Sequence, residues 1–419
     1  MRQPTDLFDK HIVPTLTALS ENSYLSAIRA GMVSVVPLTI IGGLFIIVSF
    51  LPVAGWDKIV APYLQLLQIP VSATFGLLSV FVCFAIGYDF GRQLKQEAIV
   101  SATMATLVFL MIQLRPGEKP EDTAFAMESL GSRGLFTAVV IALVSVRVQK
   151  FFTDKNMVIK LPANVPPIVA ESFLSLSPLF FLVLAFWIIR FVLGVDIDSL
   201  VQTTFKPLVF ALNTLPGILV YAFLVTLLWS VGINGDNAMD AIVAPIFLQY
   251  LAANVEAATQ GQPLPYVTAY GFFTTFVNVG GTGATIALAL IMLNSKEPGF
   301  RKVSRLSLPT QIFQINEPIF FGFPIVLNPV FMVPYVLNAL ILTAGSYLLM
   351  DWGIIRKPFV NVPWTTPPVI GHYLVSGGDW KAAVWGVASI VIAMAVYFPF
   401  AKAAERQRLK AEAAGQAHE

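Results

Sequence analysis

The chain has 419 residues, of which 56% are hydrophobic and 12% are charged, whereas about 25% of the residues in a soluble domain are charged. This composition excludes an ordinary water-soluble protein and predicts a membrane protein whose surface contacts membrane lipid. The 26 basic and 24 acidic residues leave a net charge of +2, so nucleic acid is not an expected partner.

The N-terminal segment, residues 1–22, mixes charged and apolar side chains and contains no compact apolar core. This pattern predicts an amphipathic segment at the membrane surface and argues against a cleaved signal peptide. The first long apolar run begins near Ala30, and we expect it to be the first membrane span. The single cysteine, Cys83, lies in a later apolar run and is interpreted as a small apolar residue of a helix.

The apolar runs predict an all-α membrane protein, because a helix needs about 20 apolar residues to cross the hydrocarbon core of a bilayer. A further apolar stretch, residues 238–278, is interrupted by prolines and is predicted to hold one more span and a re-entrant piece. We therefore expect about ten transmembrane helices together with re-entrant hairpins. The clear candidate spans lie near residues 30–52, 70–88, 97–114, 134–152, 171–194, 208–231, 280–294, 324–349 and 382–400.

The connections between these runs differ in charge. Lysine and arginine gather after the second and fourth runs, in residues 296–305 and in the C-terminal tail, whereas the connection after the third run is acidic. Because short cytoplasmic loops collect basic residues, this alternation predicts that both termini are cytoplasmic.

The chain divides into parts of different regularity. Residues 1–150 hold the amphipathic segment and ordinary scaffold spans, and residues 151–178, which are polar and rich in proline, predict a cytoplasmic amphipathic linker. Residues 179–401 hold one more scaffold span and then a region with glycine and proline breaks at membrane depth, and residues 402–419 form a charged cytoplasmic tail. Backbone that leaves a helix inside the membrane is tolerated where protein or a water-filled cavity satisfies it, so the irregular region is predicted to bind the substrate.

A lone carboxylate stands out in this region. Glu317 is the single acidic residue between Leu306 and Met350, a stretch without lysine or arginine, and it follows Asn316 and precedes Pro318. A charge at membrane depth is costly and is usually retained for function, and the proline disfavours helix at Glu317. We interpret Glu317 and Asn316 as substrate-binding residues; the alternative is a carboxylate at the cytoplasmic boundary.

A second candidate is the polar segment that follows the run 208–231. Asn234, Asp236 and Asn237 supply amide and carboxylate groups that suit a ligand with many hydroxyl groups, and Trp229 could stack on a sugar ring. The alternative is a polar loop beside an interfacial tryptophan.

A third candidate is the glycine-rich segment from Asn278 to Gly283, which lies in an uncharged stretch. It is typical of the unwound centre of a broken transporter helix, where Asn278 and Thr282 would face the substrate. The alternative is close helix packing through small residues. A phosphate-binding loop is not indicated, because no lysine follows the glycines.

The remaining candidate residues give weaker indications of function. Residues 363–368, which include Trp364, are too rich in proline to form a span and predict a re-entrant tip or an external loop. The three histidines are scattered, and His372 is interpreted as a polar loop residue. No metal-ligand spacing or Ser-His-Asp arrangement is present, so no metal, cofactor or stand-alone catalytic centre is expected.

Five segments, spread in order from about residue 20 to 400, carry a resemblance to a known family. They are Val35–Gly42, Pro166–Phe173, Gly280–Thr285, Asn316–Gly322 and Val362–Pro368. Together they resemble the IIC membrane component of the bacterial phosphotransferase system, in its lactose, cellobiose and diacetylchitobiose branch.

The resemblance implies a homodimer in the bacterial inner membrane, with an N-terminal dimerisation half and a C-terminal transport half. The transport half would carry a sugar, such as the β-linked disaccharides cellobiose or diacetylchitobiose, to the cytoplasm. A separate IIB subunit, phosphorylated on cysteine and supplied by IIA, would then phosphorylate the sugar, so the chain would be a phosphotransferase only as part of that complex. The family's acidic site residue corresponds to Glu317, as proton acceptor, and its tryptophans correspond to Trp229 and Trp364.

One position departs from the family pattern. The family often has histidine where this chain has Asn234. Asparagine can hydrogen-bond a sugar but cannot accept its proton, so Asp236 or Glu317 could take over that role. The alternative is an ion-coupled or facilitative sugar transporter of the same fold that does not phosphorylate its substrate.

Overall fold

The computed structural model describes residues 22–50, 55–159, 173–323 and 325–416. Residues 1–21 of the predicted amphipathic segment, residues 160–172 of the predicted linker 151–178 and residues 417–419 of the predicted tail therefore lie outside the described residues. The chain divides into two compact units, which we describe separately. The first unit is Met1–Gly42, Ile69–Val209 and Asp240–Ala252, and the second is Gly43–Gln68, Phe210–Met239 and Ala253–Glu419.

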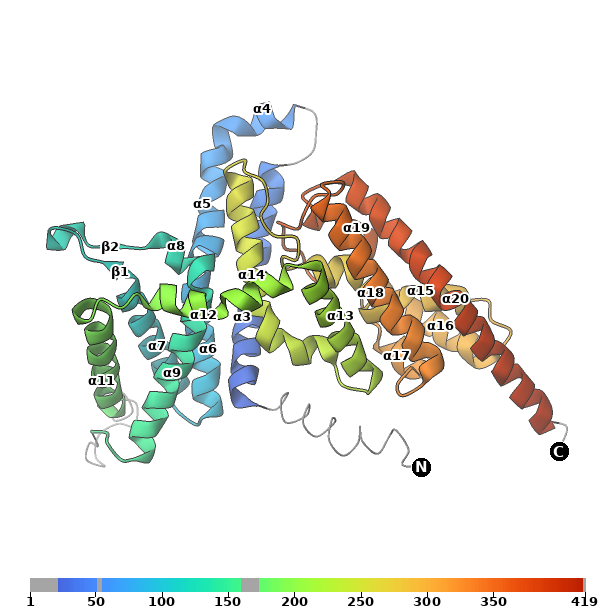
Figure 1. Ribbon diagram of the computed structural model, residues 1–419, viewed down its shortest axis with the longest axis horizontal. Helices are drawn as coiled ribbons and strands as arrows, with labels where there is room; N and C mark the ends of the chain where they lie inside the picture. Colours follow the sequence, from blue (N-terminus) through green and yellow to red (C-terminus); the bar gives the residue numbers. More distant parts are fainter. Residues whose placement is uncertain (1–21, 51–54, 160–172, 324, 417–419) are drawn as a thin grey trace. The chain divides into compact units, whose positions relative to one another are not determined.

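The described chain is almost entirely helical, apart from one pair of short antiparallel strands (Figure 1). In chain order, with η for 3₁₀ and π helices, the elements up to the first 230 residues are α3 (Ser23–Ser49), α4 (Trp56–Val60), η2 (Ala61–Tyr63), α5 (Leu64–Thr74), η3 (Phe75–Leu77), α6 (Leu78–Gln93), α7 (Ala98–Gln113), β1 (Leu114–Arg115), η4 (Pro120–Asp122), β2 (Ala124–Phe125), α8 (Met127–Leu130), η5 (Ser132–Gly134), α9 (Leu135–Asp154), α11 (Leu176–Trp187), η6 (Ile188–Val192), α12 (Ile197–Leu212) and α13 (Leu215–Ser230). The remaining elements are α14 (Gly235–Thr259), η7 (Phe272–Val277), η8 (Thr282–Ala284), α15 (Ile286–Met292), α16 (Pro298–Ile312), α17 (Glu317–Gly322), α18 (Pro329–Asp351), α19 (Pro368–Val375) and α20 (Trp380–Gln416).

Six helices of the described chain are long and apolar enough to cross a bilayer, or eight if each of two bent pairs forms one span. Two shorter apolar helices, α7 and α13, add to these. The prediction of an all-α membrane protein is confirmed, and the predicted number of about ten crossings is approximate.

The first unit is built on α6, α7 and α9, which pack against one another. Gly87 of α6 lies so close to α7 that an added Cβ would be 3.0 Å from the Cα of Ala102. Ser101 of α7 donates a hydrogen bond of 2.6 Å to the side chain of Gln149 on α9. Close packing through small residues and buried hydrogen bonds joins helices in lipid, where the hydrophobic effect does not. Cys83 is buried in α6, as its apolar surroundings predicted.

The second unit contains a broken helix in place of one predicted span. Residues 280–294 were expected to cross the membrane, but only α15 within them is a regular α-helix, and it is bent by 47° from the preceding segment Phe272–Ala284. The physical reason is the run of glycines, since Gly281 and Gly283 have φ angles of +99° and +74° that interrupt a helix. The stretch 238–278 holds α14, which continues through Pro245, and the start of the broken helix.

His372 corrects another expectation. The sequence predicts a polar loop residue, but His372 lies in α19, and its side chain is completely buried. Its ring packs edge-on against Phe276 of the broken helix, with 4.5 Å between the ring centroids, and Nδ1 is hydrogen-bonded to the carbonyl of Pro368. Nε2 has no hydrogen-bond partner within the described residues, so the protein satisfies only one of the two ring nitrogens.

The second unit ends in the long helix α20, which packs beside α18 and α19 (Figure 1). Near its C-terminal end, the Glu405 carboxylate is buried and accepts hydrogen bonds from the Ser295 hydroxyl at 2.5 Å and the Lys296 amide at 2.6 Å. Lys402, one turn earlier, is paired with the same carboxylate at 2.8 Å. These contacts fasten the end of α20 to the turn before α16.

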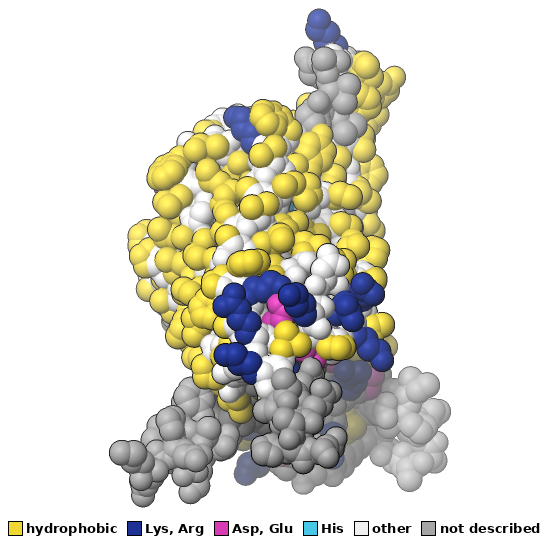
Figure 2. Space-filling model, turned by 90° about the vertical axis from the view of Figure 1, so that its right-hand side faces the viewer, with side chains coloured by type: hydrophobic (Ala, Val, Ile, Leu, Met, Phe, Trp, Pro, Cys, Tyr) yellow, Lys and Arg dark blue, Asp and Glu magenta, His cyan; other side chains and the backbone are white. Residues whose placement is uncertain are grey.

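Exposed basic residues lie on α16 and on the last turns of α20. Figure 2 shows lysine and arginine side chains gathered at one end of a face that hydrophobic side chains otherwise cover. A hydrophobic band bordered by basic residues is typical of a membrane protein at the edge of the bilayer. The residues concerned include Arg301, Lys302, Arg305, Arg406, Arg408 and Lys410.

Candidate functional site

Asp236, in the first turn of α14, is the centre of a polar cluster in the second unit. Its Oδ2 accepts hydrogen bonds from the indole of Trp229 at 2.8 Å and from the hydroxyl of Thr282 at 2.6 Å. Its Oδ1 accepts a third, of 3.2 Å, from the amide of Asn278. Both oxygens of this carboxylate are therefore engaged with protein donors, which join the end of α13 and the start of α14 to the broken helix.

Asn234 positions Asp236 by starting the helix that carries it. The side-chain oxygen of Asn234 accepts a hydrogen bond of 2.9 Å from the amide of Asn237, so Asn234 is the N-cap of α14. Asparagine is among the favoured residues at this position, because it satisfies an amide that the first turn leaves unpaired. Asp236 lies in the same first turn, where the helix dipole favours a negative charge.

The glycine-rich loop of the broken helix is held against the segment that precedes α17. The amide of Asn316 donates a hydrogen bond of 3.0 Å to the carbonyl of Thr282, and Oε1 of Gln314 accepts one of 2.6 Å from the amide of Gly280. A Cβ added to Gly281 would lie 2.4 Å from the Cβ of Asn316, so a side chain has no room there. Close packing therefore explains this glycine, while the polar groups of the loop remain beside Asp236.

Glu317 differs from Asp236 in its surroundings. It is the first residue of α17, and its side chain is exposed. Within the described residues, its carboxylate makes no hydrogen bond or ion pair. Of the two candidate carboxylates, Glu317 is the one whose oxygens are available to a ligand.

Aromatic rings pack behind the cluster. Trp229 is 5% exposed, and its ring meets Phe320 of α17 edge-on, with 5.0 Å between the centroids. Phe320 in turn packs on Tyr335 at 5.6 Å. In this arrangement the Trp229 ring supports the cluster and leaves little surface for a sugar to stack on.

Hydrogen bonds thus bring together five of the predicted site residues. Glu317 takes no part in these bonds, but it directly follows Asn316, which does. Asn237 is exposed in the first turn of α14. The five joined residues are Trp229, Asp236, Asn278, Thr282 and Asn316.

Trp364 is placed differently. It is 56% exposed, in the loop between α18 and α19. Among the described residues, no hydrogen bond or ring contact joins it to the cluster. Its predicted role stays a prediction.

Two residues of the cluster were not predicted from the sequence. Gln314 orients the glycine-rich loop from a left-handed backbone conformation with φ of +66°, which is uncommon for a residue other than glycine. Its position three residues before Glu317 in an uncharged stretch is a signal that could have identified it. Tyr335 is fully buried, and its hydroxyl has no hydrogen-bond partner within the described residues; its place in an apolar run gave no such signal.

Comparisons with known proteins agree on one family. The sequence matches the family described as phosphotransferase system, EIIC, over residues 29–339. It is 34% identical to the cellobiose-specific EIIC component of Geobacillus stearothermophilus, with 97% of this chain and 96% of the relative covered. It is 29% identical to the lactose-specific EIICB component of Streptococcus mutans, with 96% of this chain and 73% of the relative covered.

A solved structure agrees with these matches. The crystal structure of the transporter ChbC, the IIC component from the N,N'-diacetylchitobiose-specific phosphotransferase system, superposes with a TM-score of 0.90. The two sequences are 32% identical, and the alignment covers 97% of this chain and 99% of that chain.

Proposed function

Because this chain belongs to the EIIC family of the phosphotransferase system, a family of multi-span bacterial membrane proteins, we propose that it carries a β-linked disaccharide across the inner membrane. Cellobiose and diacetylchitobiose are the substrates that fit the names of its relatives. A IIC permease acts with IIA and IIB partners, and a lactose-specific relative is a combined EIICB component. The phosphotransferase activity belongs to this complex, with a phosphorylated IIB subunit as the donor.

The observation that supports this proposal most directly is the contrast between the two carboxylates. The Asp236 carboxylate accepts hydrogen bonds from Trp229, Asn278 and Thr282, so it organises the site. Glu317 is exposed and unpaired within the described residues, so its oxygens are free to contact a ligand. We therefore assign the sugar-contacting carboxylate to Glu317.

The proposed chemistry follows from this assignment. A sugar hydroxyl oxygen attacks the phosphorus of the IIB phosphocysteine, and the hydroxyl proton passes to the Glu317 carboxylate. The new O–P bond forms as the S–P bond breaks, and the cysteine leaves as thiolate. A positioned general base of this kind contributes about 10²–10⁴-fold to a rate.

The test of the proposed function is sugar uptake in vesicles. We expect uptake of cellobiose or diacetylchitobiose to require phosphorylated IIB and to deliver sugar phosphate. Uptake of unmodified sugar that depends on an ion gradient, with no requirement for IIB, would instead establish the ion-coupled alternative.

Asn234 provides a prediction that separates a capping role from a sugar contact. Asn234→Leu removes the cap of α14, at a cost of about 1 kcal/mol, and should lower the melting temperature and weaken sugar binding. Asn234→Ser keeps an oxygen that can cap the helix, so it should retain the wild-type stability. Thermal-shift and sugar-binding measurements on both variants check this; weak sugar binding by the stable serine variant would indicate direct contact with the sugar.

The histidine of the family offers a further comparison at the same position. With Glu317 as proton acceptor, the wild-type chain should phosphorylate sugar in the presence of phosphoenolpyruvate and the cognate partners, and Asn234→His should be tolerated. If the wild type bound sugar without phosphorylating it, while Asn234→His phosphorylated it, the chain would be a transporter that lacks the phosphorylation step.

The orientation and organisation of the chain are part of the same proposal. We place both termini in the cytoplasm and take residues 151–178 as a cytoplasmic linker between a dimerisation half and a moving transport half. The support is the basic charge at the end of α9 and in the C-terminal tail. The homodimer is proposed from the family resemblance.

Cysteine labelling checks this orientation. A cysteine introduced at Lys155 should react with an impermeant maleimide only from the cytoplasmic side, because Lys155 is exposed in the basic connection after α9. The native Cys83 is buried and should remain silent. Lys119→Cys, in the acidic connection after α7, is the matched control and should react only from outside. The reverse pattern would invert the proposed topology.

A further inference from the structure

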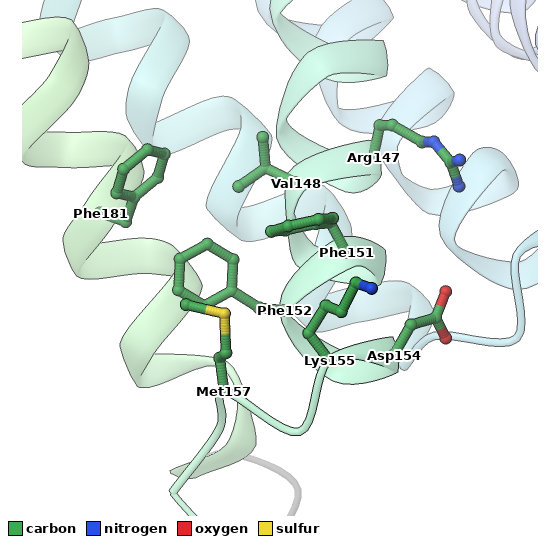
Figure 3. A pocket seen from close by; sticks show the side chains of 8 residues that line it. All are labelled: Arg147, Val148, Phe151, Phe152, Asp154, Lys155, Met157 and Phe181. Carbon is green, nitrogen blue, oxygen red and sulfur yellow. The ribbon is translucent and has the colours of Figure 1, made fainter.

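A hollow of about 750 Å³ lies at the C-terminal end of α9 in the first unit, far along the sequence from the Asp236 cluster (Figure 3). Five of its eight lining side chains are apolar. A hollow of this size can hold a small molecule, but its lining lacks the converging amides and hydroxyls that a sugar would need.

The sequence of α9 divides the lining into a basic side and an aromatic side. Arg147, Phe151 and Lys155 are spaced four residues apart, so they share one face of the helix. Phe152 lies on the neighbouring face and packs on Phe181 of α11, with 5.4 Å between the ring centroids. Figure 3 shows the two basic side chains on one side of the hollow and Phe152 and Phe181 on the other.

The basic side carries a net positive charge. Asp154 also lines the hollow, but its carboxylate is paired with Lys150 at 2.7 Å. Arg147 and Lys155 are exposed and form no ion pair within the described residues. Two cations are therefore available on this side to an anionic group.

The position of the hollow relative to the membrane indicates the kind of ligand. The segment Ser132–Asp154 is long and apolar enough to cross a bilayer, so the last turn of α9 falls where the hydrocarbon meets the headgroups. Basic side chains at that level attract anionic headgroups, while apolar side chains below them contact acyl chains.

The geometry points to a binding site for an anionic phospholipid. Its phosphate lies between Arg147 and Lys155, and an acyl chain lies along Phe152, Phe181 and Met157. The site ties the end of α9 and the middle of α11 to one lipid molecule. The lipid is thus a ligand of the scaffold and is independent of the sugar.

The test uses the full-length protein after detergent delipidation, with dioleoyl phosphatidylglycerol and dioleoyl phosphatidylcholine as probes in native mass spectrometry. We expect phosphatidylglycerol to be retained preferentially. Each basic residue near an anionic lipid contributes about a fivefold change in affinity, so Arg147→Gln with Lys155→Gln should weaken phosphatidylglycerol retention about twenty-five-fold and leave phosphatidylcholine unchanged.

Matched controls isolate the site. Lys302→Gln with Arg305→Gln removes the same charge from exposed positions of α16 that do not line this hollow, so it should weaken phosphatidylglycerol retention less than the Arg147 and Lys155 pair does. Phe181→Ala should weaken retention of the lipid, and millimolar inorganic phosphate should not displace it, because phosphate lacks the acyl chain.

Four results would overturn the proposal. The first is equal retention of the two lipids by the wild type, and the second is displacement of the lipid by inorganic phosphate. The third is equal loss of phosphatidylglycerol in the control pair. A dimer lost in the Arg147 and Lys155 variant without any change in lipid retention would also overturn it, because a second copy of the chain would then occupy this face.

Discussion

Replacing Glu317 by glutamine is expected to reduce sugar phosphorylation by about 10²-fold or more while the protein remains folded. Glutamine keeps the size of the side chain and its ability to hydrogen-bond, but it cannot accept the proton of a sugar hydroxyl. Because the Glu317 carboxylate is exposed and forms no ion pair within the described residues, its replacement removes no protein contact that stabilises the fold. The measurement is phosphoenolpyruvate-dependent phosphorylation of cellobiose with cognate IIA and IIB.

Two comparisons make this experiment decisive. Glu256→Gln removes an exposed carboxylate near the end of α14 and should behave like the wild type. Sugar binding by Glu317→Gln should be weakened less than phosphorylation, since the amide can still bind a hydroxyl. Normal phosphorylation by the variant would show that Glu317 has no role in the chemistry.

Replacing Asp236 by asparagine is expected to destabilise the second unit and to weaken sugar binding at least tenfold. Asparagine has a single oxygen, so it must lose either the bond from Asn278 or those from Trp229 and Thr282, and its amide would face other donors. Hydrogen bonds to a charged group contribute about 1.5–3 kcal/mol each, so the free energy of unfolding should fall by about 2 kcal/mol or more. Thermal denaturation with and without sugar measures both effects.

The control for Asp236 is the exposed residue Asp351 at the end of α18. Asp351→Asn removes the same charge, and the free energy of unfolding should change by no more than about 0.5 kcal/mol, as is usual at the surface. If Asp236→Asn had the stability and sugar affinity of the wild type, the hydrogen bonds around Asp236 would not hold the site together.

The membrane fold could be predicted largely from local sequence. A run such as residues 30–52 is long and apolar, and lipid leaves a single chain segment few alternatives to a helix. The run 280–294 shows the limit of this reasoning. Its hydrophobicity predicts an unbroken span, whereas the glycine-rich segment from Asn278 to Gly283 predicts the unwound centre of a broken helix. The positive φ angles of Gly281 and Gly283 confirm the second prediction, which hydropathy alone could not make.

The candidate site was predictable as a set of residues but not as a set of contacts. From the sequence, Glu317 and Asp236 are both candidates to accept a sugar proton: Glu317 is a lone carboxylate in an uncharged stretch, and Asp236 lies two residues after Asn234 in a polar segment. Their different roles depend on Thr282, which meets Asp236 across 46 residues of sequence. Such a pairing is a result of tertiary folding, and the sequence near either residue does not reveal it. The capping role of Asn234 was in principle predictable, since asparagine is a favoured N-cap.

The length of α20 has a consequence for observing transport. Its 37 residues span about 55 Å, whereas the hydrocarbon core is about 30 Å thick, so part of the helix extends into water. The hydrogen bonds from Ser295 and Lys296 to Glu405 hold this part of α20 against the rest of the second unit. The projecting end therefore moves together with the second unit. A small tilt inside the bilayer becomes a larger displacement at the tip. A spin label or fluorophore at the exposed residue Lys410 would therefore report the motion of this unit without touching the sugar site.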